Sequence, residues 1–392
     1  MRVCFVSHSS KLGGAERVLL ETVEVLKHHG VDCRVILPGL GEFSEALNCI
    51  DVPIAVVPGH SWVEWGNPSA WMRLKAALKI ARATVRTVGE IKRWNCDLAY
   101  SNTVTICSGA LAAAWLKLPH VWHLHEFGYE DHGLVFDFGD ALSYWILRSS
   151  SVAYIAVSHC LAKKYERYLE PAKISVIYPS MHRALTTTSE HENECRPNRR
   201  FRCILIGGLV EGKGQEEAVR AFSLLPRNAV DAELLLVGDG DPRYRARLHE
   251  IADAASLQER VIFVGAVKDA SALVRTCDAV LVCSRSEAFG RATVEGMLAG
   301  RPVIGAKAAA TSELIRDGVN GLLYTHGHPE ELAEKIAYLY QNPKAAYILG
   351  QNAKDWAQKI FTADRYWKEL SPRLAAVAPM RERALSVHCA SE

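Results

Sequence analysis

The chain has 392 residues, 49% of them hydrophobic and 23% charged, which is the size and composition of a globular protein with two domains. Its formal net charge of +2 argues against a nucleic-acid-binding protein, because such proteins carry a clear basic excess. No apolar run approaches the roughly 18 residues of a membrane span, and the N-terminal apolar run 3–6 is too short for a signal peptide, so we expect a cytoplasmic protein. The eleven cysteines include no C-x-x-C pair, which argues against a zinc cluster or a disulfide framework.

Short apolar segments alternate with helical patterns over residues 1–180. Several of these segments are apolar throughout, which is typical of parallel strands covered on both faces. Helices are predicted between them, among them 15–29 and 67–94. The repeated β-α order predicts a doubly wound parallel sheet. The predicted strands are 3–7, 33–37, 54–57, 98–100, 120–123, 154–157 and 174–177.

A polar segment, 181–200, interrupts this order and is predicted to be a linker. A second β-α series follows over 200–360, so we expect two tandem Rossmann-like α/β domains facing a cleft, where ligands bind beyond the carboxyl ends of the strands. Residues 361–392 are assigned to a C-terminal helix, which can return to the first domain, and to a tail that is poorly ordered after Pro372. The strands of this series are predicted at 203–206, 234–237, 261–264, 279–283 and 303–304, and its last helices at 329–341, 344–359 and 362–370.

A glycine-rich loop follows the first strand of each domain. Gly13 and Gly14 precede a helix, where backbone N–H groups can approach a phosphate or a sugar oxygen, although a tight turn without a ligand has the same pattern. The second loop, 207–214, places Lys213 at the start of the next helix. A lysine there can pair with a diphosphate and stabilise the charge on its departure, unless it is a solvated surface residue.

The segment 284–300 joins a buried strand to a helix that begins near Gly290. The first backbone N–H groups of this helix would point at the cleft with a partial positive charge, which suits a diphosphate. Glu287 in the loop can accept hydrogen bonds from sugar hydroxyls, and Glu295, about one turn inside the helix, from a ribose diol. The alternative is that Glu287 is a loop charge and Glu295 a salt-bridged helix residue.

These motifs occur in an order that resembles the retaining GT-B glycosyltransferases of family 4, the glycosyl transferases group 1. The resemblance covers nearly the whole chain and is most specific in the second domain. In the first domain it rests on Gly13-Gly14-Ala15-Glu16 and on His125-Glu126. In the second domain it rests on 207–214, 237–240, 263–265, 287–300, 301–305 and 313–323.

The resemblance implies a role for individual residues, with His125, Lys213 and Glu287 as catalytic residues. His125 would contact the transferred sugar, Lys213 would hold the diphosphate and Glu287 would bind sugar hydroxyls. Gly13 and Gly14 would bring backbone close to the diphosphate or the acceptor. The first domain, 1–180, would be the acceptor side, and the second, 200–360, would bind the nucleotide-sugar. The other implied donor contacts are the backbone N–H groups of Phe289 and Gly290, the ribose-binding Glu295, and the base-binding loop 265–267 with Val267.

One position departs from the family, which usually has an arginine where this chain has Gly208. The change removes one of two cations from the leaving diphosphate, and a charge-assisted contact of this kind is worth about 1.5–3 kcal/mol. Arg285, Arg291 or the bound acceptor could supply the missing charge at the donor site, and a reduced or altered activity is the alternative.

The reaction that the resemblance implies needs neither a metal ion nor a cofactor. It moves a sugar from a UDP- or GDP-sugar to a glycan or lipid-linked acceptor in the synthesis of cell-surface polysaccharide or glycoconjugates. Asp239-Gly240-Asp241 has the spacing used by metal-dependent transferases but is predicted to be a turn. Two other functions keep the same fold: a nucleotide-sugar epimerase or a phosphorylase, and a non-catalytic nucleotide-sugar-binding protein with a degenerate donor site.

The predicted helix 67–94 combines a basic stripe with an apolar face. Tryptophans precede or open it, and basic residues beside tryptophans suit an anionic membrane surface, here the inner face of a membrane. The alternative is the solvated face of a helix that packs against the sheet. The stripe is Lys75, Lys79, Arg82 and Arg86, the apolar face is Leu74, Leu78, Ala81, Val85 and Val88, and the tryptophans are Trp62, Trp65 and Trp71.

Overall fold

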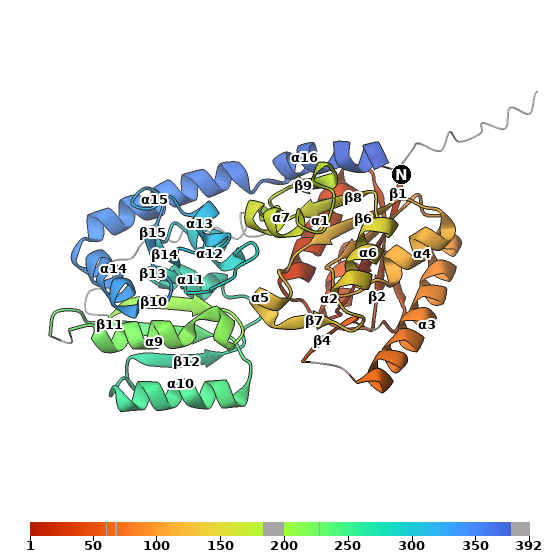
Figure 1. The fold of residues 1–392 in the computed structure, drawn as a ribbon. Helices are drawn as coiled ribbons and strands as arrows, with labels where there is room; N and C mark the ends of the chain where they lie inside the picture. Colours follow the sequence, from red (N-terminus) through yellow and green to blue (C-terminus); the bar gives the residue numbers. More distant parts are fainter. Residues whose placement is uncertain (60, 67–68, 183–199, 227, 378–392) are drawn as a thin grey trace, which may run out of the picture.

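The computed structural model describes residues 1–59, 61–66, 69–182, 200–226 and 228–377. Two α/β domains lie side by side, each built on a parallel sheet with helices around it (Figure 1). Most of the predicted linker lies outside the described residues. No helix within them has the length and apolar content that crossing a membrane requires.

The first sheet has seven parallel strands in the order β3-β2-β1-β5-β6-β8-β9. All seven strands predicted for this part of the chain are present, because helices cover both faces of the sheet and bury the apolar residues. The strands are β1 (Arg2–Ser7), β2 (Asp32–Leu37), β3 (Ile54–Val56), β5 (Leu98–Asn102), β6 (His120–Leu124), β8 (Ala153–Ala156) and β9 (Ile174–Val176). The helices are α1 (Gly14–His28), α2 (Glu42–Asn48), α3 (Ala70–Trp94), α4 (Ser108–Leu116), α6 (Asp140–Ser150) and α7 (His159–Tyr165).

An antiparallel pair of short strands was not predicted. β4 (Val63–Trp65) pairs with β7 (Leu134–Phe136), and the one-turn helix α5 (Tyr129–His132) precedes β7. The two strands pair with each other outside the main sheet and across about 70 positions, so the repeated β-α order does not predict them. The pair lies outside the main sheet, near the end of the first domain that faces the second (Figure 1).

The second sheet has six parallel strands in the order β12-β11-β10-β13-β14-β15. Five of the six were predicted, and β15, with three residues, was not. The strands are β10 (Phe201–Ile206), β11 (Ala232–Val237), β12 (Val261–Gly265), β13 (Ala279–Val282), β14 (Val303–Ala306) and β15 (Leu322–Tyr324). The helices are α9 (Gln215–Leu224), α10 (Pro242–Ala254), α11 (Ser271–Thr276), α12 (Arg291–Leu298), α13 (Thr311–Leu314), α14 (Pro329–Gln341) and α15 (Pro343–Ile360).

The last described helix, α16 (Ala363–Val377), returns to the first domain and packs on α1 (Figure 1). The Tyr366 hydroxyl lies 2.9 Å from the Thr22 hydroxyl, and Leu374 is fully buried in the same cluster as the core of α1. The prediction of poor order after Pro372 is therefore wrong up to Val377: the helix continues through Pro372 because its apolar face is buried on both sides of the proline. Residues 378–392 lie outside the described residues.

The carboxyl ends of the two sheets face each other, as predicted. Arg17 of α1, the helix after β1, donates to the carbonyl of Lys268 in the loop after β12 at 2.7 Å. The Glu313 carboxylate, on the helix after β14, accepts the backbone N–H of His159 at 2.9 Å and the hydroxyl of Tyr178 at 2.8 Å. Because these contacts come from segments that follow strands, the ligand-binding ends of both sheets lie at the domain boundary.

Candidate functional site

The second glycine loop brings Lys213 to Glu287. Lys213 lies in a 3₁₀ turn (Glu211–Lys213) before α9, not in that helix as predicted, because Gly214 interrupts the backbone with φ of +72°. A Cβ at Gly214 would stand 2.2 Å from the carbonyl oxygen of Cys283, so only glycine fits. The Lys213 Nζ then lies 2.9 Å from the Glu287 Oε2.

This ion pair keeps a cation beside the loop. Burial by itself lowers the pKa of Lys213, but the Glu287 carboxylate outweighs burial and the net pKa is raised. Lys213 is therefore charged at neutral pH, and an anion that reaches the loop can share its charge with Glu287. Two residues that the sequence separates by 74 positions, both predicted as catalytic, are in direct contact.

Gly208 lies in the same loop but has a different environment. Its φ is in the ordinary range, its surface is exposed, and a Cβ there would meet only the Asp239 carbonyl oxygen, at 3.6 Å, among the described residues. The backbone therefore does not require glycine at this position. Arg285 lies beside the loop, since its backbone N–H donates to the Gly212 carbonyl at 3.2 Å.

The first turn of α12 forms the second part of the site. Gly290, which precedes the helix, has φ of +89°, and a Cβ there would lie 3.3 Å from the Glu287 Cγ. The Phe289 ring is 6% exposed and packs 5.8 Å from the Phe361 ring. Phe289 can therefore offer its backbone N–H to a ligand, but not its ring.

Arg291 is held by two carboxylates, one from each domain. Its Nη1 lies 3.0 Å from the Glu21 Oε2, and its Nε lies 3.6 Å from the Glu295 Oε1. Burial raises the pKa of Glu295, and the charge of Arg291 partly offsets this effect. The charge of Arg291 is thus shared between Glu21 and Glu295 at the domain boundary. The Arg285 side chain, in contrast, is exposed to solvent. Val267, in the predicted base-binding loop, is 38% exposed.

In the first domain, His125 and the first glycine loop are connected through Asn102. The Asn102 Nδ2 donates to the Ala15 carbonyl at 3.1 Å, which turns its Oδ1 toward the His125 Nε2 at 2.8 Å. Burial, together with the positive field of Arg291 and neighbouring histidines, holds the pKa of His125 well below its usual range. The ring is neutral, with a proton on Nε2 and an acceptor lone pair on Nδ1.

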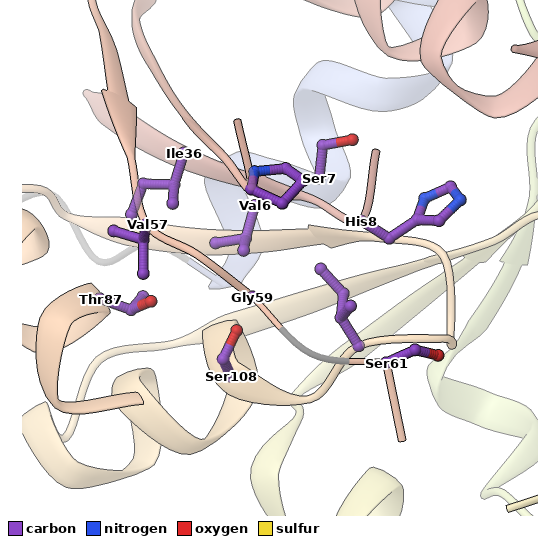
Figure 2. A pocket seen from close by; sticks show the side chains of 11 residues that line it. Val6, Ser7, His8, Ile36, Val57, Gly59, Ser61, Thr87 and Ser108 are labelled. Carbon is purple, nitrogen blue, oxygen red and sulfur yellow. The ribbon is translucent and has the colours of Figure 1, made fainter. Parts of the chain in front are cut away.

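The first glycine loop leaves the N-terminus of α1 open. A Cβ at Gly14 would meet no described atom within 4 Å, whereas one at Gly13 would stand 3.0 Å from the Glu16 carboxylate. Glu16 is buried and lies 3.0 Å from the His8 Nδ1. Figure 2 shows a small cavity beside His8, whose ring points away from Val57. Its volume of 50 Å³ holds a few water molecules.

The predicted turn at Asp239-Gly240-Asp241 is present. The Asp241 Oδ1 accepts the backbone N–H of Arg243 at 2.9 Å and caps α10, and the Asp239 Oδ1 accepts the backbone N–H of Gly240 at 3.0 Å. Within the described residues, no group of three or more histidine, cysteine, aspartate or glutamate side chains is arranged to hold a metal ion.

Helix α3 has one apolar face in the core and a second one in solvent. The core face includes Ile80 and Ala83, which are buried against the protein. Of the predicted apolar face, Leu74 and Leu78 are each 52% exposed and Val85 is 55% exposed, whereas Val88 is buried in the core. The basic stripe beside them is exposed as well, and residues 67 and 68 lie outside the described residues.

Of the three tryptophans predicted beside α3, Trp71 is exposed and Trp62 is not, and the side chain of Trp65 lies outside the part of the chain that the structure describes. Trp62 is fully buried, because its ring stacks on Trp122 and its indole N–H donates to the Val104 carbonyl, so it cannot contact a surface. Among the described side chains, the exposed tryptophans lie on α3, α4 and α6, and α4 contacts both of the other two helices. They are Trp71 of α3 (62% exposed), Trp115 of α4 (62%) and Trp145 of α6 (56%).

Family models match both halves of the chain. Residues 187–356 match glycosyl transferases group 1, and residues 12–182 match Glycosyltransferase Family 4. An uncharacterised glycosyltransferase of Methanocaldococcus jannaschii is 27% identical over 254 residues, which is 65% of this chain and 68% of that protein. The N-acetyl-alpha-D-glucosaminyl L-malate synthase of Bacillus anthracis is 26% identical over 216 residues, which are 54% of this chain and 56% of that protein.

Solved structures resemble the whole described fold. HepE of Anabaena, in complex with UDP-glucose, superposes with a TM-score of 0.80 and 26% sequence identity over 96% of this chain and 100% of that one. Each of the two domains is thus matched by a model of one class of enzyme, the glycosyltransferases. The two sheets also have the arrangement of a known glycosyltransferase structure. The chain belongs to the family 4, group 1 glycosyltransferases and has their two-domain GT-B fold.

Proposed function

We propose that this protein transfers a sugar from a UDP-sugar to an acceptor in polysaccharide or glycoconjugate synthesis, with retention of the anomeric configuration and without a metal ion. The observation that carries the proposal is the contact of Lys213 with Glu287 at the glycine loop, beside the first turn of α12. HepE, which has been solved in complex with UDP and with UDP-glucose, supports UDP as the nucleotide.

In this scheme the donor lies along the carboxyl ends of the second sheet. Lys213 and the backbone N–H groups of Phe289 and Gly290 bind the diphosphate. Glu287 accepts hydrogen bonds from the sugar hydroxyls, and Glu295 from the ribose. The base lies near Val267, and Arg285 is the exposed cation that can stand in for the arginine absent at Gly208.

In the proposed transfer reaction, negative charge develops on the diphosphate as it leaves the sugar. The bond between the anomeric carbon and the diphosphate oxygen breaks while the acceptor oxygen bonds to the same face of the sugar, and the acceptor proton passes to the departing diphosphate. Fixed donors stabilise the negative charge of the leaving group without reorganisation, which is the largest single contribution in many enzymes. The neutral His125 contacts the sugar through Nδ1, and no protein nucleophile is required.

A thermal-unfolding series with UDP-, GDP-, ADP- and dTDP-glucose tests the donor. A ligand that binds only the folded state raises the unfolding temperature, so we expect a rise with UDP-glucose that exceeds the other three. Equal temperatures with and without every ligand would contradict the proposal and favour a degenerate donor site. Comparison of the product's anomeric coupling constants with those of the donor tests retention.

We also propose that α3 holds the enzyme on an anionic membrane surface, such as a cytoplasmic leaflet, where lipid-linked acceptors reside. The exposed apolar stripe of α3 has the length of several turns, and the basic stripe lies along its edge. The Lys75 Nζ lies 5.1 Å from the centre of the Trp71 ring, which places a cation and an interfacial aromatic together. This surface is on the flank away from the second domain (Figure 1), so binding leaves the domain boundary accessible.

Flotation with phosphatidylcholine vesicles, with and without phosphatidylglycerol, tests the membrane proposal. Each surface lysine or arginine contributes about 1 kcal/mol near an anionic membrane, so Lys79→Gln with Arg82→Gln should weaken binding about 30-fold. The control replaces two exposed lysines of α15, Lys344→Gln with Lys359→Gln, and should bind as the unmodified protein does. Binding that is equal in both double variants, or absent with phosphatidylglycerol, contradicts the proposal.

A further inference from the structure

A cavity of 260 Å³ lies in the first domain beneath the antiparallel pair β4–β7. The strand pair forms one wall, and the segments that follow β5 and β6 form another. Helices α6 and α7 close the remaining sides. The lining residues used below are Thr105, Glu126, Phe136, Tyr144, Lys164 and Tyr168.

The strand pair over the cavity is anchored by Trp62. The Trp62 backbone N–H donates to the Thr105 carbonyl at 3.1 Å, and its carbonyl accepts the Asp137 N–H at 2.8 Å. Its ring stacks on Trp122 of β6. These contacts tie both β4 and the end of β7 to the main sheet, so the cavity has fixed walls.

Glu126 places a buried carboxylate at the cavity. It is 6% exposed, and its Oε1 accepts the Val104 backbone N–H at 2.8 Å. A carboxylate has about four acceptor positions, so capacity remains for hydroxyl groups of a ligand. Burial raises the pKa of Glu126 to about 7. None of the donor contacts proposed above uses this residue.

Aromatic rings form another part of the cavity lining. The Tyr144 and Tyr168 rings stack with centres 3.8 Å apart, and the Phe136 ring packs edge-on to Tyr144 at 5.5 Å. Lys164, which pairs with Glu130, adds a cation at the lining. Apolar walls with a few polar groups are typical of small-molecule sites, and rings beside a carboxylate suit a sugar, which has C–H faces and hydroxyl edges.

The one-turn helix α5 lies between this cavity and the glycine loop 207–214, which carries Lys213. Glu130 lines the cavity, and its backbone carbonyl accepts from the Arg285 guanidinium at 3.4 Å. The Asp131 carbonyl lies against Gly212, where a Cβ would stand 3.2 Å away. The cavity is therefore next to the loop that carries Lys213, as the acceptor of a transfer must be.

We propose that this cavity binds the sugar ring of the acceptor, with Glu126 accepting hydrogen bonds from its hydroxyls and the tyrosine wall packing on its C–H face. The proposal rests on the transferase function proposed above and names the acceptor class: a pyranoside with free hydroxyl groups. Glu126 and Tyr168 then bind the acceptor, and substituting either of them should leave the affinity for the donor unchanged.

Saturation-transfer NMR with three probes tests the proposal: methyl β-D-glucopyranoside, methyl β-D-galactopyranoside and methyl N-acetyl-β-D-glucosaminide. We expect saturation of the ring protons of at least one probe. Glu126→Gln, which keeps the acceptor for Val104, and Tyr168→Ala, which is at the partly exposed rim, should each weaken that probe's affinity about fivefold or more. Tyr347→Ala, an exposed tyrosine of α15, is the matched control and should leave it unchanged.

The same samples separate this proposal from the proposed function. The affinity for UDP is measured by calorimetry, and the probes are measured with and without UDP. Absence of UDP binding overturns the transferase proposal, whereas the probe signal still decides the cavity. Absence of saturation for all three probes, or equal affinity in Glu126→Gln, Tyr168→Ala and the unmodified protein, overturns the acceptor site.

Discussion

Substitution of Gly208 by arginine tests whether the donor site lacks only a cation. A side chain can be added at this exposed position without strain, because a Cβ would be in ordinary contact at 3.6 Å from the Asp239 carbonyl. The new guanidinium would reach the same diphosphate that Lys213 binds in the proposed complex. A hydrogen bond to a charged group contributes about 1.5–3 kcal/mol, so Gly208→Arg should lower the Kd for UDP about 10- to 150-fold.

Isothermal calorimetry with UDP measures this change directly. Val210→Arg is the control. Val210 is 41% exposed in the same loop, so an arginine there adds the same net charge at a different position. The gain from Gly208→Arg should shrink as salt is added, because salt screens exposed charges. If Gly208→Arg and Val210→Arg bind UDP equally well, the position does not face the diphosphate and the reasoning is refuted.

Two further predictions concern stability. Glu126 has a pKa of about 7 in the folded protein against an ordinary value of 4.5, so the folded state binds its proton more tightly, and the stability that this provides is lost as pH rises from 4.5 to 7. Between about pH 4.5 and pH 8, the free energy of unfolding measured by denaturant titration should fall by about 3 kcal/mol more in the unmodified protein than in Glu126→Gln. An equal fall in the two proteins would contradict the raised pKa of Glu126. Gly214→Ala should lower the free energy of unfolding by about 3 kcal/mol or more, because its Cβ would stand 2.2 Å from the Cys283 carbonyl oxygen, and equal stability with the control Gly208→Ala would show that the loop relaxes.

All strands of the two sheets except β15 could be predicted, because a strand that is buried on both faces is apolar along most of its length. β11 is apolar at all but one position and buried at every position, and the prediction missed only its first two residues. β4 and β7 have three residues each, and their pairing depends on Trp62 and on a partner segment about 70 residues away, which no local pattern reveals.

The site could be predicted in part, because its residues follow strands in a fixed order. Glycine at 290 is required by its φ of +89°, and the sequence shows it at the expected strand-to-helix turn. The contact of Arg291 with Glu21 could not be predicted, since it joins residues 270 positions apart across two domains. The burial of Glu126 likewise depends on the walls that β4 and β7 supply.

The exposure of α3 shows why periodicity alone was insufficient. Its sequence contains two apolar stripes, one with Ile80 and Ala83 and one with Leu74 and Leu78, and either could face the core. Small residues decide the outcome, because Ala76 and Ala83 let the helix approach its neighbours closely while the larger side chains remain outside.

The most direct test of the account is the affinity of UDP for the unmodified protein and for Lys213→Gln. Glutamine keeps a hydrogen-bond donor for Glu287 and removes the positive charge, so the fold should be retained. We predict one UDP site per chain in the unmodified protein and a Kd about tenfold higher or more in the variant, since a charged hydrogen bond to the diphosphate is lost. An unmodified protein that does not bind UDP, or a variant that binds it equally well, would contradict the account.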